Sequence, residues 1–261
     1  MWSMFRVATS GAHAQQRALD VAANNLANAQ TTGFKSQRAD IVDLPPEDAV
    51  FTLAGVDGGV TLDLGQIGQG AAIAATTADY RPGPAVQTGR PLDVAITGEG
   101  YIPVLTSDGL AAYTRDGSLR VDAQGRLATG SGDLVAPGFQ LPAGATDVAI
   151  DGGGRITARV GDARQDVGVL QLVRFVNSDG LVPLGGNLVG ASLAAGDPIV
   201  GTPGTDGLGT LAPASLEGSN VDTAEELVRV LQAQRAYQAN LRALRTIDEM
   251  AQEANDLRRS S

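Results

Sequence analysis

The sequence predicts an α+β protein: long N- and C-terminal helices pair as a coiled coil, and the chain between them forms a central antiparallel all-β domain. Three observations carry this prediction. Apolar residues recur at helical intervals at both ends of the chain, short apolar runs fill its middle, and Asp-Gly pairs separate those runs. Asp-Gly is a strong hairpin signal because both of its residues tolerate positive φ.

The first helix is predicted within residues 1–33, with its regular part ending near Ala29. Its small or apolar positions recur every three or four residues, the period of one helical face; they are Met4, Ala8, Gly11, Ala12, Leu19, Ala22 and Leu26. Gly33 stands where a left-handed residue would end the helical segment. At about 1.5 Å per residue, this rod is about 40 Å long.

The second helix is predicted within residues 221–261, regular to about Arg258. Asp222 and Glu225 have the spacing of a capping box, and Arg258 and Arg259 lie at the opposite end, so the charges agree with the helix direction. Its apolar stripe repeats about every 3.5 residues, as in coiled coils; it comprises Leu227, Val230, Leu231, Tyr237, Leu241, Leu244, Ile247, Ala251 and Ala254. Two such long rods, one at each terminus, indicate a coiled pair.

Between the helices the sequence predicts three segments. Residues 34–85 are expected to form an extended connector with short strands, residues 86–190 the β domain, and residues 191–220 a Gly- and Pro-rich return connector. In the β domain four Asp-Gly pairs lie between or beside the apolar runs, which predicts turns there; they are Asp108-Gly109, Asp116-Gly117, Asp151-Gly152 and Asp179-Gly180.

The composition argues against several function classes. The net charge of −10 disfavours a nucleic-acid partner, which needs a basic face to neutralise phosphates. The chain has no cysteine and a single histidine, His13, so thiolate and histidine-based metal sites are excluded and a catalytic triad has no suitable base. The Asp-Gly pairs lack the spaced acids of a calcium-binding loop. We therefore expect no cofactor and no enzymatic activity.

The sequence shows no pattern typical of a conventional targeting segment. The first residues lack the basic region and unbroken apolar run of a conventional signal peptide, and no stretch approaches the roughly 18 apolar residues of a membrane span. By default such a chain stays in the cytoplasm, unless it leaves by a route that cleaves no signal.

Three asparagines near the end of the first helix are poor helix-interior residues, because their amides compete for backbone hydrogen bonds; they are Asn24, Asn25 and Asn28. One hypothesis is that they form interhelical amide hydrogen bonds that set the register between subunits. The other is that they only shape the helix end near Gly33.

Several motifs, in order along the chain, resemble those of the bacterial flagellar rod and hook protein family. The first is Ala23-Asn-Asn-Leu-Ala-Asn-Ala-Gln-Thr-Thr-Gly-Phe-Lys35. The others occupy residues 91–101, 113–118, 201–211, 216–221, 224–228 and 234–237. Within the family the chain is most similar to the distal-rod members. It departs from them in residues 39–64, where Ile41-Val-Asp-Leu-Pro-Pro46 replaces an aromatic and acidic helix extension.

The resemblance implies a structural subunit that assembles helically into the hollow drive shaft linking motor to hook. The implied partners are further copies of the chain, other rod proteins, the hook protein, the flagellar export apparatus and the surrounding P- and L-ring proteins, with no nucleic acid and no direct membrane insertion. The implied location is the basal body outside the cytoplasm, reached by export without a cleaved signal. A proximal rod protein, a hook-like paralogue and a non-flagellar carbohydrate-binding β protein are the alternatives.

Subunit contacts are then expected along both helical stripes and at the asparagines. The candidate interface residues are Met4, Ala8, Leu19, Ala22, Asn24, Asn25, Leu26, Asn28, Leu227, Val230, Leu231, Tyr237, Leu241, Leu244, Ile247 and Ala251.

Overall fold

The computed structural model describes residues 2–45, 47–53 and 60–260. It confirms the α+β class: α1 (Trp2–Ala27) and α2 (Thr223–Ser260) are the two long helices, and antiparallel strands lie between them in the chain. These residues fall into two compact units, one of residues 1–26, 37–77 and 223–261 and one of residues 27–36 and 78–222. We call them the helical unit and the β unit.

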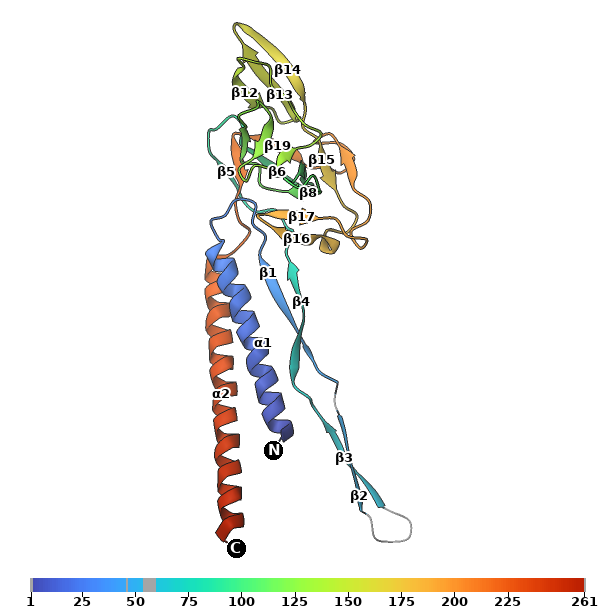
Figure 1. Ribbon diagram of the computed structural model, residues 1–261, viewed down its shortest axis with the longest axis vertical. Helices are drawn as coiled ribbons and strands as arrows, with labels where there is room; N and C mark the ends of the chain where they lie inside the picture. Colours follow the sequence, from blue (N-terminus) through green and yellow to red (C-terminus); the bar gives the residue numbers. More distant parts are fainter. Residues whose placement is uncertain (1, 46, 54–59, 261) are drawn as a thin grey trace. The chain divides into compact units, whose positions relative to one another are not determined.

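In the helical unit, α1 and α2 lie side by side (Figure 1). Small residues on α1 permit this approach: Ala8, Ala12 and Ala22 are buried, and a Cβ atom added to Gly11 would lie 3.1 Å from the Asn240 amide of α2. On α2, the positions that face the rest of the chain repeat every seven residues, with Glu226 and Ala233 both buried. The predicted heptad pairing thus exists within a single chain.

The segment after α1, predicted to be an extended connector with short strands, contains four described strands. These strands pair in two ribbons: β1 (Gln37–Asp43) pairs with β4 (Ala71–Ala78), and β2 (Glu47–Leu53) pairs with β3 (Val60–Ile67). All side chains of β1 and β4 are exposed or half-buried. A ribbon with so little buried surface needs no strict apolar alternation, so its sequence has no readable two-residue period.

In the β unit, a seven-stranded sheet has the order β16-β17-β8-β7-β11-β10-β9, a three-stranded sheet has the order β12-β13-β14, and the remaining strands pair as β15-β18, β19-β6 and β20-β5. The strand bounds are β5 Ala85–Gln87, β6 Val94–Thr97, β7 Ile102–Leu105, β8 Ala111–Thr114, β9 Leu119–Val121, β10 Leu127–Thr129, β11 Leu134–Val135, β12 Thr146–Ile150, β13 Arg155–Val160, β14 Ala163–Val169, β15 Leu172–Arg174, β16 Val182–Gly185, β17 Leu188–Gly190, β18 Ile199–Gly201, β19 Thr210–Pro213 and β20 Ser215–Glu217, with a 3₁₀ turn at Ser178–Gly180.

Two of the predicted Asp-Gly turns close hairpins. Asp108-Gly109 lies between β7 and β8, and Asp151-Gly152 lies between β12 and β13. The predicted return connector, residues 191–220, instead contributes β18, β19 and β20 to this unit. These strands are only three or four residues long and are separated by Gly and Pro turns, so their alternation is too short to recognise in the sequence.

The β unit has a continuous core that includes the fully buried Ile102, Leu119, Leu127, Ile156 and Leu172. A smaller aromatic cluster lies beside Val173. Its rings meet edge to face, with the Tyr113 and Phe175 centroids 4.9 Å apart and their planes at 83°. This geometry stabilises aromatic pairs beyond their buried area.

Candidate structural site: the motif cluster

Asn25, near the end of α1, is fully buried and bonds to the backbone of β1. Its amide Nδ2 donates to the Gln37 carbonyl at 2.7 Å, and its Oδ1 accepts from the Gln37 N–H at 2.9 Å. The side chain therefore imitates a strand partner and ties the helix to the first residue of the ribbon. Both Nδ2 and Oδ1 of Asn25 are therefore engaged within the chain.

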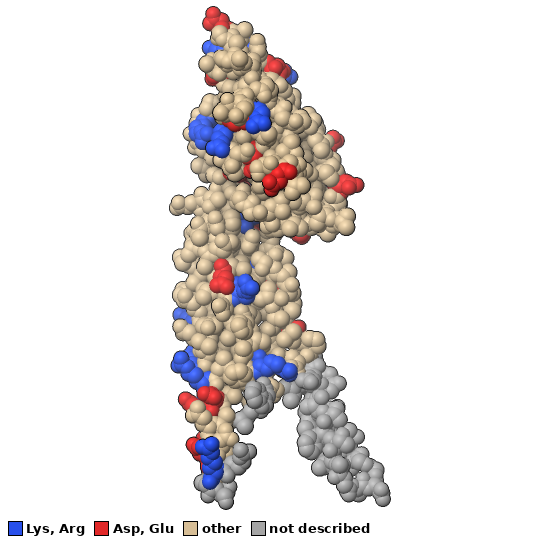
Figure 2. Space-filling view, in the orientation of Figure 1, with Lys and Arg blue, Asp and Glu red and all other residues tan. Residues whose placement is uncertain are grey.

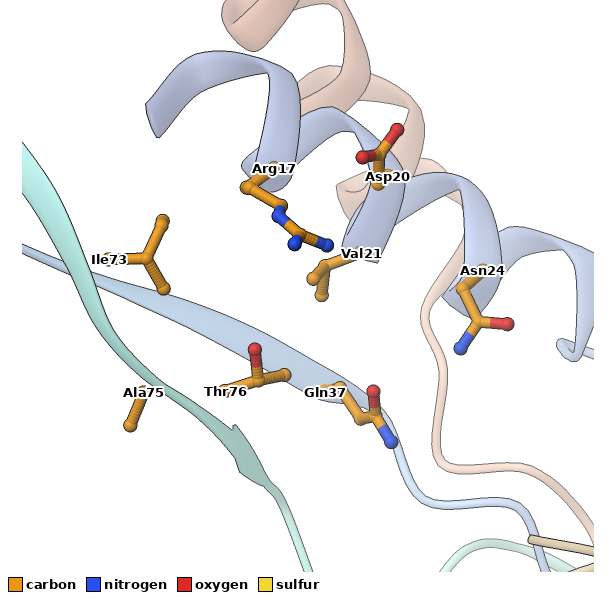
Figure 3. A pocket seen from close by; sticks show the side chains of 8 residues that line it. All are labelled: Arg17, Asp20, Val21, Asn24, Gln37, Ile73, Ala75 and Thr76. Carbon is orange, nitrogen blue, oxygen red and sulfur yellow. The ribbon is translucent and has the colours of Figure 1, made fainter. Parts of the chain in front are cut away.

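The other two asparagines occupy different environments. Asn28 lies past the end of α1, where its Oδ1 accepts from the Thr31 hydroxyl at 3.1 Å in a turn of the β unit. Asn24 is exposed and lines a hollow of about 550 Å³, into which side chains of α1 point toward those of β1 and β4 (Figure 3). The three asparagines therefore do not form one amide cluster.

Gly33 has the predicted left-handed conformation, with φ of 69°, although α1 ends six residues earlier at Ala27. Its N–H donates to the Glu217 carbonyl at 2.8 Å, and a Cβ atom here would lie 2.8 Å from the Asp116 N. Both the backbone angle and the close approach therefore require glycine.

Glu217 lies at the centre of a buried ionic site in the β unit. Its side chain is 1% exposed, and its Oε1 accepts from Lys35 Nζ at 2.6 Å and from the Gly83 N–H at 2.9 Å. Its Oε2 accepts from Arg115 Nε at 2.8 Å. We call Gly33, Lys35, Arg115, Asp116, Glu217 and Asn220 the motif cluster. The carboxylate thus has three donors, which is what a buried charge requires.

The terminal nitrogens of Arg115 donate hydrogen bonds to backbone carbonyls. Its NH1 donates to Gly100 O at 3.0 Å and its NH2 to Gly98 O at 2.9 Å. The guanidinium also lies 5.7 Å from the centroid of the Tyr101 ring, within the range of a cation–π contact. A planar, five-donor group can satisfy all of these partners at once, which a lysine cannot.

Asp116 and Asn220 complete the cluster with hydrogen bonds to the segment that follows α1. Asp116 Oδ1 accepts from the Thr32 hydroxyl at 3.2 Å. Asn220 Oδ1 accepts from the Ser36 N–H at 2.7 Å, and its Nδ2 donates to Asp79 O at 2.8 Å. Residues 32–36 are therefore held on both sides by parts of the chain that are far away in sequence.

Burial shifts two pKa values here. Desolvation lowers the pKa of Lys35 from its ordinary value, an effect that the neighbouring Glu217 carboxylate opposes. Desolvation also raises the pKa of Tyr101 to about 12. Lys35 and Arg115 both pair with the Glu217 carboxylate, so the site joins two basic side chains to one acidic one.

The candidate interface residues on the helices separate into two groups. Ala8 and Ala22 are buried, and most of the others are half-buried; these are Leu19, Leu26, Val230, Tyr237, Leu241, Leu244, Ile247 and Ala251. Met4, Leu227 and Leu231 are instead exposed by 61%, 50% and 52%. Exposed Val228 lies beside the two leucines, and we call Leu227, Val228 and Leu231 the α2 apolar patch.

The sequence reading missed the ionic part of the motif cluster. Lys35 lies 182 residues from Glu217, and Arg115 lies 102 residues from it, so only the folded chain brings them together. One signal was available: Lys35 is the only lysine in an arginine-rich chain. In the described part of the chain, no three His, Asp or Glu side chains gather as metal ligands would, and no described helix is apolar over the length that a membrane crossing needs.

Comparison with known proteins matches three regions of the chain to flagellar families. Residues 5–35 match the family "Flagella basal body rod protein", residues 95–158 match "Flagellar hook protein FlgE/F/G D1 domain", and residues 212–257 match "Flagellar basal body rod FlgEFG protein C-terminal". Each region contributes to the motif cluster: Lys35 belongs to the first, Arg115 and Asp116 to the second, and Glu217 and Asn220 to the third.

Relatives that align over nearly the whole chain are also flagellar rod proteins. The chain is 38% identical to the flagellar basal-body rod protein FlgG of Agrobacterium fabrum, with 94% of this chain and 95% of the relative covered. It is 40% identical to FlgG of Buchnera aphidicola, with 96% of this chain and 98% of the relative covered. The rod protein FlgF of Escherichia coli is 30% identical over 91% of this chain and 90% of its own length.

The chain therefore belongs to the flagellar basal-body rod protein family, whose members are structural proteins and not enzymes. Within the family it is an FlgG-like structural subunit of the distal rod, which agrees with the sequence motifs and not with the proximal-rod alternative.

Proposed function

We propose that copies of this chain assemble helically into a tube, with the paired helices forming an inner wall around an export channel and the β unit facing outward. The specific partners proposed are further copies of the chain, the hook protein, the export apparatus and the P- and L-ring proteins. Family membership supports assembly with other rod components in general. The proposed route to the basal body is export without a cleaved signal.

The observation that best supports self-assembly is the α2 apolar patch. Leu227, Val228 and Leu231 are each exposed by half or slightly more, in two adjacent turns of one helix. Contiguous exposed apolar surface of this kind marks an interaction site. Burying the exposed half of each side chain would contribute roughly 1 kcal/mol per residue, and the sum repeats at every subunit of a polymer.

The half-buried stripe of α2 has a different proposed role. In the single chain it faces α1, so we propose that it first pairs the two helices of one subunit. The outward patch then joins one subunit to the next. The remaining candidate interface residues are proposed to become covered when neighbouring helix pairs pack side by side.

Microscopy and circular dichroism of the purified full chain across concentration test this proposal. A filament subunit should form regular polymers above a threshold concentration, whereas a carbohydrate-binding β protein should stay monomeric. Leu231→Asp should raise the threshold strongly, because it puts a charge into a desolvated contact. Leu193→Asp is the matched control at a fully exposed leucine of the β unit. A chain that stays monomeric at every concentration, alone and with other rod proteins added, contradicts the proposal.

A further inference from the structure

The hollow between α1 and the ribbon of β1 and β4 is an open surface of the helical unit. Its volume of about 550 Å³ lies within the range of pockets that bind ligands. We call it the α1–ribbon hollow and define it by six lining residues: Arg17, Asp20, Val21 and Asn24 of α1, and Ile73 and Thr76 of β4. Figure 3 shows that apolar and polar side chains alternate around it. Such a lining fits apolar side chains with a charged group at their rim.

The α1–ribbon hollow lies on the side of α1 that faces away from α2. Gly11 marks the side that meets α2, because a Cβ atom there would contact Asn240. At about 100° per residue, Arg17, Asp20 and Asn24 project about 120–180° around the helix from Gly11. The hollow is therefore out of reach of the α2 helix of its own chain.

The α2 apolar patch lies on the side of α2 that faces away from α1. Leu227, Val228 and Leu231 project about 120–180° around α2 from Asn240. In the view of Figure 2, the surface over the first turns of α2 carries few charged side chains. The hollow and the patch are thus on opposite sides of the helix pair.

The hollow and the patch also lie at the same level along the helices. The two helices run in opposite directions (Figure 1), and Gly11 is beside Asn240. Nine residues further along α1 is Asp20, and nine residues back along α2 is Leu231, so these two residues are level with each other. A neighbouring copy could therefore bring its patch to the hollow by a sideways displacement alone.

One pair of opposite charges flanks this contact. Asp20 is exposed at the hollow, and Arg235 is exposed about 140° around α2 from Asn240, on the side of the patch. Among the described residues, neither Asp20 nor Arg235 has an ion-pair partner within the chain. Arg235 lies four residues, roughly 6 Å, along α2 from Leu231, a distance that a long arginine side chain spans.

We propose that the α1–ribbon hollow of one copy receives the α2 apolar patch of a second copy, with Arg235 of the second copy paired to Asp20 of the first. The inference rests on the proposed function, because it specifies the surface that the patch meets in the rod. The occupant is a second copy because the chain itself carries an apolar face at the level of the hollow and an opposite charge beside it.

This contact can propagate. It joins two different surfaces, so every bound copy keeps one free hollow or one free patch for the next copy. Each copy is displaced sideways by at least the width of the helix pair, roughly 20 Å, so a third copy lies beyond the second and does not overlap the first. A contact between two patches would instead have two-fold symmetry and stop at a dimer.

The test uses cells in which the gene for this chain is deleted and replaced by variants, with complete rods counted in purified basal bodies. Asp20→Arg and Arg235→Asp should each lower the yield of complete rods about tenfold or more, because like charges then meet at every contact. The combined variant exchanges the two charges and should restore the yield. Arg164→Glu, a reversal at an exposed residue of the β unit, should leave the yield unchanged.

A full yield from either single reversal, or a combined variant no better than the single ones, would overturn this contact and leave the rod function intact. Complete rods in the deletion strain itself would instead overturn the proposed function.

Cross-linking gives a second measurement, because the chain has no cysteine. Thr76 and Val228 lie on opposite sides of the helix pair, so a short bis-maleimide should not join cysteines at these positions within one chain. A ladder of multimers from the Thr76→Cys, Val228→Cys double variant supports the head-to-tail contact. No product, or a product that stops at dimers, overturns it. Val228→Cys alone should give no product, and dimers from it would show that the patch meets a second patch instead.

Discussion

At the scale of single residues, Glu217 joins parts of the chain that are far apart in sequence. Its carboxylate binds Lys35 and Arg115, and its carbonyl accepts from the Gly33 N–H. The segments that lead out of α1 and into α2 are thus held on the β unit by one side chain and its backbone. Buried, fully bonded charges hold these segments firmly, because removing one partner of such a pair is costly.

Removing the anion should harm the β unit more than removing one cation. Glu217→Gln leaves Lys35 and Arg115 buried without a counter-charge, and should lower the free energy of unfolding by about 3–5 kcal/mol. Lys35→Met keeps the Arg115–Glu217 pair and should cost less. Urea unfolding followed by near-ultraviolet circular dichroism, to which Tyr80, Tyr101 and Tyr113 contribute, measures both.

The control for this pair is Asp166→Asn. Arg155 and Asp166 form an ion pair whose side chains are 59% and 49% exposed, so its loss should change stability by no more than about 1 kcal/mol. If Lys35→Met proves as damaging as Glu217→Gln, the carboxylate is not the centre of the site.

Tyr101 should make the β unit sensitive to high pH. Its pKa is raised to about 12 by burial, so between about pH 10 and 12 the unfolded chain releases a proton that the folded chain retains. Stability therefore falls as pH rises through this window, by up to about 3 kcal/mol. Tyr101→Phe should abolish this part of the dependence. The lowered pKa of Lys35 makes stability rise with pH as long as the pH is below the ordinary pKa of lysine. This contribution is present in both proteins, so it cancels in the comparison.

The comparison is made by urea titrations of the two proteins at several pH values from 9 to 12. The free energy of unfolding of the unmodified protein should fall relative to that of Tyr101→Phe as the pH rises. Parallel curves would show that the Tyr101 hydroxyl does not resist ionisation in the folded protein.

At the scale of elements, α1 is built from small residues because it contacts two neighbours. One face meets α2 at Gly11 and Asn240, and another meets the ribbon, where Ser10 Oγ accepts from the Ala71 N–H at 3.3 Å. Buried alanines on α1 let both neighbours approach the helix backbone closely.

Enlarging Gly11 should therefore separate the helices. Gly11→Leu places a branched side chain where even a Cβ atom lies 3.1 Å from Asn240, and should destabilise the helical unit by about 1–3 kcal/mol despite the better helix propensity of leucine. Thermal unfolding at 222 nm measures the change. Ala23→Leu, at an exposed position of the same helix, is the control. Equal transitions for the two variants would mean that α1 and α2 do not pack through Gly11.

The helices could be predicted closely and the strands only in part. Periodicity located α1 and α2 to within a few residues of Trp2–Ala27 and Thr223–Ser260, because one long element repeats the same signal many times. The ribbon of β1 and β4 and the short strands β18 to β20 had too little periodicity to read. The motif cluster depends on contacts across more than 100 residues, which no local pattern encodes.

At the scale of the whole molecule, the surface of α2 suggests an order of assembly. The half-buried stripe pairs α2 with α1 within one chain, and the α2 apolar patch remains exposed. In the proposed rod, burial of this patch would then supply the affinity between copies.

The most direct test of the rod account is the yield of complete rods and hooks in basal bodies from a deletion strain that expresses Leu231→Asp. We predict a folded protein whose circular dichroism matches that of the unmodified chain, since Leu231 is half exposed, in cells that build no rod beyond the proximal part and do not swim. Leu193→Asp should build normal rods. Normal rods and motility with Leu231→Asp would contradict the claim that the outward face of α2 joins the subunits.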